Sequence, residues 1–405
     1  MSWTHIGYAQ EIHFGRGSIA DAPQIIERLR AQRVLLITTR RGRDSAAAGR
    51  LVQALGERLS AVFDGARPHV PESVARRAFE QARAARVEAI VSLGGGACAD
   101  LGKAVCWFAE RERHGGGTQP GAGGQQGGGG PQSGGGQNGT AARAGAGGEP
   151  TAPRLSCFDR PALAHIAVPT TYSGAEVTAT FGMLDEATHR KTGIAGPTLA
   201  PAGVIYDPEA TLDLPPRVSA ETGMNALAHC VEAAWSPVRT PEAEAIAYAG
   251  AARIYRALPR VVDHPHDLDA RTELLAGAML AGRCLQNASM GVHHGLSQML
   301  GGRTGIAHGL ANALILAHAV RFNQDAVPEV VARLAEIFGR RDGDAAAAID
   351  ELRARLGLPA HLGECGVRRE DIEAVAAASP ANPRIAQNPK QVGKADALAI
   401  LQAAL

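Results

Sequence analysis

The first half of the chain alternates short aliphatic runs with longer stretches in which apolar residues recur every three or four positions. Residues 33–39 and 88–93 are almost continuously aliphatic, as in parallel strands that are covered on both faces. The stretches at residues 45–59 and 72–85 have the apolar spacing of amphipathic helices. This alternation predicts an α/β N-terminal domain with a doubly wound, Rossmann-like sheet.

Helical periodicity replaces this alternation in the second half of the chain. From about residue 212 to the C-terminus, Ala, Leu, Glu and Arg recur with the spacing of helices, and strand-like runs cease. A chain of 405 residues also exceeds the usual size of one domain. We therefore expect a nucleotide-binding α/β domain over residues 1–211 and an all-α catalytic domain over residues 212–405.

Residues 113–152 interrupt the first domain with Gly, Gln, Ser, Pro and Ala and almost no large apolar side chains. Such a segment cannot bury enough surface to offset the entropy lost on ordering. We expect a disordered insertion and assign it no chemistry.

The overall charge narrows the range of partners. Lys and Arg number 41 against 40 Asp and Glu, a formal net charge of +1, so nothing indicates binding to nucleic acid or to an anionic membrane. No apolar run reaches the roughly 20 residues that span a bilayer, and no signal peptide is evident, so we expect a cytoplasmic protein. The six cysteines form no CxxC pair and are expected to be reduced structural thiols.

A glycine loop follows the aliphatic run at residues 88–93 directly and opens a predicted helix. Gly94, Gly95 and Gly96 would let the backbone approach a pyrophosphate, and the helix N-terminus would offer free N–H groups. With Ala99 the loop satisfies a relaxed dinucleotide fingerprint, although a tight structural turn explains the glycines equally well. The loop follows the third strand-like run after the first glycine turn, so we expect a non-standard Rossmann arrangement.

Three histidines of the helical half lie among apolar and small residues, where an imidazole is costly to bury unless its nitrogens are used. They are His229, His294 and His308. Asn225 precedes the first by four residues and shares its helix face, while Gly295 and Gly309 would leave room for an approaching group. A single buried histidine is more often a hydrogen-bonded core residue, but three favour a site in a cleft between the domains.

Several motifs, taken together and in order, resemble the iron-containing (group III) alcohol dehydrogenase family over nearly the whole chain. They are Phe14-Gly-Arg-Gly17, Gly94-Gly-Gly-x-x-x-Asp-x-x-Lys103, Pro169-Thr-Thr171, Val204-Ile-Tyr-Asp-Pro208, Gly223-Met-Asn-Ala-Leu-Ala-His229, Leu300-Gly-Gly302 and His308-Gly309. The resemblance implies the dehydroquinate synthase-like architecture of that family and homodimers.

Two departures place the chain within the family. Metal-dependent members carry Asp where this chain has Asn225, and an amide brings no charge to a hard cation, so we expect no metal. If a metal is bound, its ligands would be Asn225, His229, His294 and His308. The Pro169-Thr-Thr-Tyr172 loop and the pair His293-His294 resemble maleylacetate reductases, although Gln298 stands where those enzymes generally have a further histidine.

That resemblance implies reduction of maleylacetate, a small dicarboxylate, to 3-oxoadipate by NADH or NADPH during aromatic-compound degradation. The implied catalytic residues are His229, His294, His308, Asn225 and Tyr172. The implied cofactor-binding residues are Gly94, Gly95, Gly96, Asp100, Thr170, Thr171 and Lys191. We expect His293 to point away from the site, and His165, His318 and His361 to be structural.

Three questions stay open at the level of sequence. Cations for the substrate carboxylates would come from among Lys191, Arg253 and Arg283, and the arginines at residues 40–43 either meet a 2′-phosphate of NADPH or face solvent. A metal-dependent (iron or zinc) alcohol or polyol dehydrogenase is the nearest alternative function. A sensor that binds the cofactor without turnover is the second.

Overall fold

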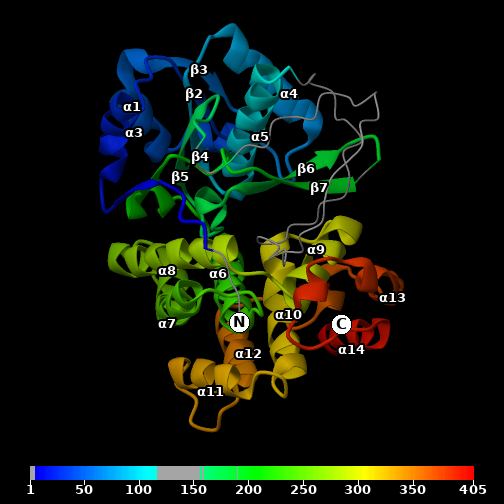
Figure 1. The fold of residues 1–405 in the computed structure, drawn as a ribbon. Coiled ribbons are helices and arrows are strands. Elements are labelled where there is room, and N and C mark those ends of the chain that lie inside the picture. Colours follow the sequence, from blue (N-terminus) through cyan, green and yellow to red (C-terminus); the bar gives the residue numbers. More distant parts are fainter. Residues whose placement is uncertain (1–4, 116–155, 157–158, 189) are drawn as a thin grey trace, which may run out of the picture.

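The computed structural model describes residues 5–115, 156, 159–188 and 190–405. A sheet with helices on both faces forms one half of the molecule, and a helical assembly forms the other (Figure 1). The predicted combination of an α/β half with an all-α half is confirmed. The division at residues 211 and 212 stays a prediction.

Six parallel strands form the main sheet in the order β1-β8-β5-β4-β2-β3. Their bounds are β1 (Glu11–Phe14), β2 (Val34–Ile37), β3 (Leu59–Phe63), β4 (Ala89–Gly94), β5 (Ala164–Pro169) and β8 (Gly203–Tyr206). The strands β2 and β4 lie within the aliphatic runs at residues 33–39 and 88–93. These two strands, β5 and β8 are almost wholly buried. A sheet covered on both faces requires such runs.

Alternate residues of the central strands enter different cores. In β2, Val34 and Leu36 pack with α1 (Ala22–Arg28) and α3 (Ala46–Leu55), whereas Leu35 and Ile37 pack on the opposite face. The helices on that opposite face are α4 (Glu72–Ala84) and α5 (Gly96–Arg113). Because side chains alternate along a strand, this pattern is the doubly wound arrangement that the sequence predicts.

A hairpin extends from the sheet half over the helical half. Its strands β6 (Thr180–Asp185) and β7 (Arg190–Ala195) pair antiparallel, with Leu184 opposite Lys191, and lie above α9 in Figure 1. No pattern in the sequence predicts that this hairpin leaves the main sheet.

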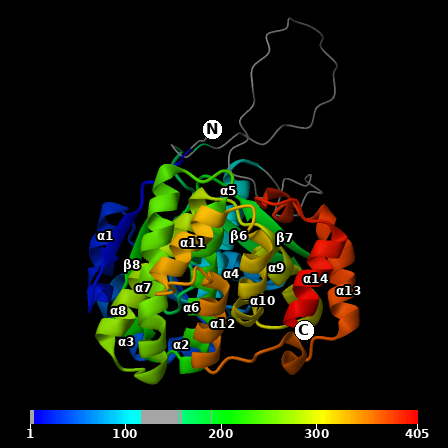
Figure 2. The same ribbon diagram turned by 90° about the horizontal axis from the view of Figure 1, so that it is seen from below.

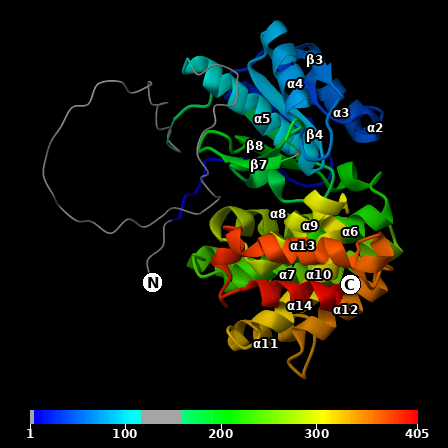
Figure 3. The same ribbon diagram turned by 90° about the vertical axis from the view of Figure 1, so that its right-hand side faces the viewer.

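The helical half is built around α6, which is buried from Gly223 to Trp235. The helices are α6 (Pro216–Trp235), α7 (Pro241–Asp263), α8 (Leu268–Asn287), α9 (Val292–Thr304), α10 (His308–Asn323), α11 (Pro328–Ile337), α12 (Ala345–Arg355), α13 (Arg369–Ala378) and α14 (Lys394–Ala404). Seen from below, α7 and α8 lie on one side and α13 and α14 on the other, with α6 and α10 between them (Figure 2). The helices α6, α8 and α9 face the sheet half (Figure 3).

Three further expectations from the sequence concern the insertion, the cysteines and membrane-spanning helices. Of the predicted insertion at residues 113–152, only residues 113–115 fall in the described part of the chain, and α5 ends there at Arg113. The described cysteines, which exclude Cys157, are free thiols. Within the described ranges, no helix is long and apolar enough to cross a membrane.

Candidate active site

The fold brings the three predicted histidines together from three helices. His229 lies in the middle of α6, His294 in the first turn of α9, and His308 at the start of α10. The rings of His229 and His294 stack with centroids 4.6 Å apart, and those of His294 and His308 are 6.2 Å apart. Residues far apart in sequence therefore form one imidazole cluster.

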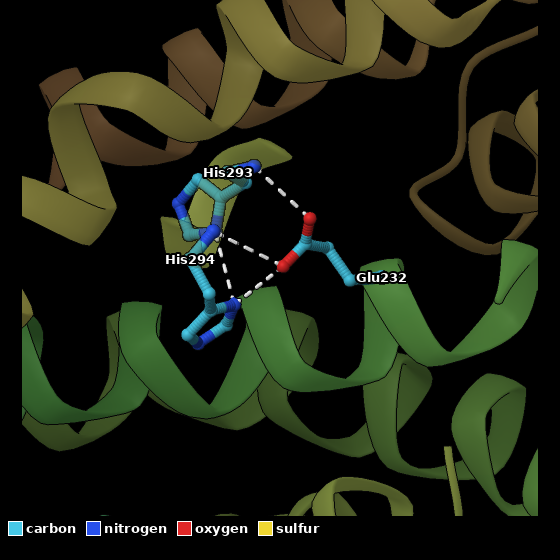
Figure 4. A group of neighbouring side chains, drawn as sticks. All are labelled: Glu232, His293 and His294. Carbon is cyan, nitrogen blue, oxygen red and sulfur yellow. Dashed lines mark hydrogen bonds and ion pairs between the residues drawn. The ribbon is translucent and has the colours of Figure 1, made fainter. Parts of the chain in front are cut away.

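Glu232 is the acid of this cluster, and it is not among the site residues predicted from the sequence. Its fully buried carboxylate accepts hydrogen bonds from the backbone N–H groups of Gly291 and His293, at 3.0 Å each, and of His294, at 3.2 Å. It also accepts a 2.6 Å hydrogen bond from Nδ1 of His294 (Figure 4). Because α9 has no side-chain cap of its own, Glu232 satisfies the free amides of its N-terminus.

The environment of Glu232 keeps it ionised. Burial raises its pKa, but the hydrogen bonds with His293 and His294 outweigh burial and hold the pKa well below its usual range. The dipole of α9 also favours a negative charge at this point. For His294, burial lowers the pKa to about 4, although Glu232 opposes the shift. At neutral pH the cluster therefore consists of neutral imidazoles beside one buried carboxylate.

Hydrogen bonding fixes which nitrogen of His294 carries the proton. Nε2 of His293 donates to the carbonyl oxygen of Asn312 at 2.9 Å, and its Nδ1 lies beside Nδ1 of His294. Nδ1 of His294, 3.2 Å away, donates to Glu232 and therefore carries the hydrogen of the neutral ring. Nε2 of His294 is left with a lone pair, is buried, and has no hydrogen-bond partner. His293 thus belongs to the network, contrary to the expectation that it points away from the site.

Asn312 connects the remaining members of the cluster. Its Nδ2 donates to Oδ1 of Asn225 at 2.6 Å and to Nε2 of His308 at 3.0 Å. When Nε2 of neutral His308 accepts, its Nδ1 carries the hydrogen and becomes the donor. Burial holds the pKa of His308 well below its usual range. His308 therefore presents an N–H group, and Asn225 is already engaged by an amide.

The four residues implied as metal ligands fit a hard divalent cation poorly. They include no carboxylate, and Asn312 already engages both Oδ1 of Asn225 and Nε2 of His308. Among the described residues, the group with metal-ligand spacing is Glu232, His293 and His294. In that group, the 2.6 Å separation of oxygen and nitrogen is a hydrogen bond, and both carboxylate oxygens already accept N–H groups. We therefore derive no catalytic step through a metal.

The glycines beside the histidines serve packing rather than ligand access. A Cβ on Gly295 would lie 2.3 Å from Cγ1 of Ile385, and a Cβ on Gly309 would lie 2.6 Å from the carbonyl oxygen of Glu221. The groups that approach these helices closely are thus other parts of the chain. This corrects the expectation that the two glycines leave room for a ligand.

The glycine loop lies where the sheet changes winding direction. The chain passes from β2 outward to β3 and then returns with β4 to the other side of β2, which is the usual location of a ligand crevice. Gly95 caps the 18-residue helix α5 with no side-chain hydrogen bond, so the first amides of α5 are free to meet a phosphate. The hydroxyls of Thr38 and Thr171, which follow β2 and β5, are buried without partners. The loop therefore fits a dinucleotide.

The loop after β5 packs against the glycine loop on one side and the helical half on the other. The backbone N–H of Thr170 donates to the carbonyl oxygen of Gly94 at 2.9 Å, and a Cβ on Gly95 would lie 2.9 Å from Cγ2 of Thr171. A Cβ on Gly174 would meet the backbone of Gly282 in α8 at 2.8 Å and Nδ1 of His229 at 3.7 Å. The glycine loop and the histidines are thus joined through one short segment, whereas a cleft between them stays a prediction.

Asp100 and Tyr172 take different positions around this segment. Asp100 is 3.3 Å from the ammonium of Lys103, a fully buried lysine that also donates to the carbonyl oxygens of Ala175 and Thr180. Tyr172 is fully buried, and its hydroxyl accepts a 3.1 Å hydrogen bond from Arg271. Burial raises the pKa of Tyr172. The tyrosine hydroxyl is directed into the core, so Tyr172 anchors the loop.

The candidate cations differ in whether they are paired with an acidic residue on the surface or act on the histidines. Arg253 pairs with Glu273, and Arg283 pairs with Glu242, both on the surface. Lys191 lies on the hairpin, and its charge lowers the pKa of His308. The charge of Arg384, which is not among the cations predicted from the sequence, lowers the pKa of both His294 and His308. Gln298 is exposed one turn beyond His294.

Comparison with protein-family models matches residues 9–125 to "Iron-containing alcohol dehydrogenase" and residues 219–405 to "Fe-containing alcohol dehydrogenase family, C-terminal". The chain belongs to the iron-containing alcohol dehydrogenase family. The predicted resemblance is thereby confirmed.

Individual relatives agree with this assignment. A maleylacetate reductase of Rhizobium sp. (strain MTP-10005) is 34% identical over 393 residues, which cover 97% of this chain and 95% of the relative. The crystal structure of a maleylacetate reductase from Agrobacterium tumefaciens superposes with a TM-score of 0.81 at 32% identity, covering 100% of this chain and 98% of that one. A sulfoacetaldehyde reductase from Bifidobacterium kashiwanohense, solved in complex with NAD+, gives 0.82 at 25% identity, covering 100% and 99%.

Proposed function

We propose that this chain catalyses the NAD(P)H-dependent reduction of maleylacetate to 3-oxoadipate. Similarity to several maleylacetate reductases at 30 to 34% identity supports this activity. The single structural observation that carries the proposal is the pair formed by Glu232 and His294, in which Nε2 of the histidine is unpartnered. Such a pair can hold and release a proton without a metal.

The reaction adds one hydride and one proton across a carbon–carbon double bond. The reduced nicotinamide supplies the hydride to the alkene carbon that is β to the ketone. The electron pair of the double bond moves towards the ketone, whose oxygen gains negative charge as an enolate. Collapse of the enolate places a proton on the carbon between the ketone and the carbon that received the hydride. This gives 3-oxoadipate and the oxidised cofactor.

The residues of the cluster meet the two demands of this chemistry. Nδ1–H of His308 is a donor for the enolate oxygen. A neutral imidazole can donate this hydrogen bond without any change in its protonation state. Nε2 of His294 takes up a proton from solvent, Glu232 stabilises the resulting imidazolium, and the proton then passes to the enolate carbon, which leaves His294 neutral again. His229 stacks on His294 and limits the movement of its ring. Asn225 holds Asn312, which in turn orients His308.

Cofactor binding is assigned to the sheet half. Gly94, Gly95 and Gly96 would hold the pyrophosphate at the N-terminus of α5, with Asp100, Thr170 and Thr171 beside the rest of the nicotinamide half. The family and the relative solved with NAD+ support a nicotinamide cofactor. The choice between NADH and NADPH stays open, because Arg40 and Arg41 in the short helix α2 (Arg40–Arg43) are exposed.

The nearest alternative is a metal-dependent alcohol or polyol dehydrogenase of the same family. The donor set around Asn225 is the observation against it, since an amide replaces the charged ligand. No observation favours a sensor that binds the cofactor without turnover. The expected homodimer stays a prediction.

The test is an assay of the purified full-length chain for oxidation of NADH and NADPH. Maleylacetate should support turnover at least about 100-fold faster, in kcat/KM, than propanal or 1,3-propanediol in the reverse direction, since a difference of several kcal/mol separates a matched site from an unmatched one. Turnover of the aldehyde or diol alone, dependent on added iron or zinc, would replace the proposal with the metal-dependent alternative.

A further inference from the structure

The segment that follows α13 carries an arginine to the histidine cluster. It comprises two 3-10 turns, Ser379–Ala381 and Ile385–Gln387, and packs against the first turns of α9. Ile385 fills the space above Gly295, the residue that follows His294. Asn388 accepts a hydrogen bond from the backbone N–H of Val292 at 3.2 Å. The segment is therefore held against α9 immediately after Arg384.

Arg384 differs from the paired arginines of the surface. Its side chain is half-buried, yet no hydrogen bond or ion pair joins its guanidinium to another group in the described part of the chain. Burial lowers its pKa, and the charge of Glu232 opposes this shift. Glu232 already accepts four N–H groups and cannot serve as the partner of Arg384. The five N–H donors of the guanidinium are thus available to an anionic ligand.

Lys191 lies on the hairpin of the other half of the molecule and is exposed. Its side chain folds over Gly182 on the neighbouring strand, where a Cβ would lie 2.2 Å from Cε of the lysine. Its ammonium also has no hydrogen bond or ion pair to any described residue. Loss of hydration lowers its pKa, the charge of Asp100 opposes this, and the charge of Arg384 lowers it further. The charges of Lys191 and Arg384 thus both act on His308, and neither cation has a carboxylate bonded to it among the described residues.

We infer that Arg384 and Lys191 bind the two carboxylates of the substrate, and that Arg384 sets the preference for a dianion. This inference rests on the function proposed above. A guanidinium binds a carboxylate through two parallel hydrogen bonds and so fixes its orientation, whereas an ammonium acts as a mobile point charge. The rigid segment therefore holds one end of the substrate, and the hairpin carries the cation for the other end.

The chemistry also separates Arg384 from the cofactor site. The free amides at the N-terminus of α5 already provide for the pyrophosphate. Arg384 comes from the helical half, beside the ring that is to hold the proton, so its partner is the molecule that receives that proton.

The inference is tested by isothermal titration calorimetry of the full chain with NAD+ and then with 3-oxoadipate, a dicarboxylate whose binding requires no turnover. Arg384→Gln is expected to raise the Kd of 3-oxoadipate roughly 10- to 100-fold, since a hydrogen bond to a charged group contributes that much, and to leave the Kd of NAD+ unchanged. Arg384→Lys, which keeps the charge but loses the planar pair of donors, should give an intermediate Kd. Lys191→Gln should weaken 3-oxoadipate as well, by a smaller factor.

Arg253→Gln and Arg283→Gln are the matched controls, because both arginines are paired on the surface, and both variants should bind 3-oxoadipate like the wild type. Thermal unfolding of each variant verifies folding, and Arg384→Lys carries the test if Arg384→Gln does not fold. Equal Kd values for the Arg384 variants and the controls, a parallel loss of NAD+ affinity, or no binding of 3-oxoadipate by the wild type would overturn the inference. Normal 3-oxoadipate binding without maleylacetate turnover would instead count against the proposed function.

Discussion

Replacement of Glu232 by Gln tests the proton-holding pair directly. The carboxylate accepts two N–H groups on each oxygen, whereas a glutamine offers one acceptor oxygen and one NH2 group. If the glutamine oxygen keeps the amides of Gly291 and His293, its NH2 group faces both the backbone N–H and Nδ1–H of His294. The histidine must then shift its proton to Nε2, and the lone pair required for catalysis is lost.

The magnitude follows from the bonds removed. The NH2 group of the glutamine leaves the backbone N–H of His294 without an acceptor, and a buried donor without a partner costs about 1 to 3 kcal/mol of the free energy of unfolding. Loss of a positioned general acid lowers kcat by roughly 10²- to 10⁴-fold. Urea unfolding and single-turnover oxidation of NAD(P)H with maleylacetate measure the two effects separately.

Glu329→Gln is the matched control, because Glu329 is exposed on α11 and the substitution makes the same atomic change. It should alter the free energy of unfolding by less than about 0.5 kcal/mol and leave kcat unchanged. If Glu232→Gln is destabilised but retains kcat within a few-fold of the wild type, then Glu232 only caps α9 and the catalytic reasoning is wrong.

Three further outcomes are expected. Prolonged dialysis against a chelator should leave kcat within about twofold, since metal dependence is not expected of a neutral donor set; a loss of activity restored by iron or zinc would support the metal-dependent alternative. Tyr172→Phe should cost about 1 to 2 kcal/mol in urea unfolding, because Arg271 loses a buried acceptor, with kcat within about threefold; a large loss of kcat at unchanged stability would restore a catalytic role. Burial lowers the pKa of His165 to about 3, so the unfolded chain binds a proton there below pH 6.5 and the folded protein does not. The free energy of unfolding of the protein should therefore fall as the pH drops from 6.5 towards 4, and His165 should contribute up to about 3 kcal/mol of this loss. His165→Asn should reduce the slope by this contribution, whereas the exposed His264→Asn should leave the slope unchanged. Equal slopes in both variants would contradict the burial argument.

The fold was predictable because its main signals are local. Aliphatic runs such as residues 33–39 mark buried strands, and helical spacing marks the second half. The hairpin β6–β7 was not predictable, because pairing partners outside the main sheet leave no local pattern. It matters for the site, since it carries Lys191 towards the helical half.

The site was predictable only where chemistry is unusual for its surroundings. Burying a histidine among alanines and glycines is costly unless its ring nitrogens have a role, and this identified His229, His294 and His308 as candidates. Glu232 was not identified, because a glutamate on a helix most often faces solvent, although its position three residues after His229 places it on the same face. Arg384 depends on a tertiary contact between Ile385 and Gly295 that no spacing within the sequence encodes.

The same contact explains why two glycines were misinterpreted. A small residue beside a site residue indicates a close approach but does not say whether a ligand or another segment makes it. At Gly295 and Gly309 the chain itself makes the approach. Conversely, Tyr172 matches a motif of the relatives, yet its hydroxyl bonds to Arg271 in the core.

The central claim is that a nicotinamide bound at the glycine loop of the sheet half faces the imidazole cluster of the helical half. A crystal structure of the full chain with oxidised cofactor and 3-oxoadipate tests it most directly. The account predicts pyrophosphate against Gly94, Gly95 and Gly96, with 3-oxoadipate between the nicotinamide ring and His294. A pyrophosphate bound elsewhere, or a nicotinamide ring turned away from the histidines, would contradict it.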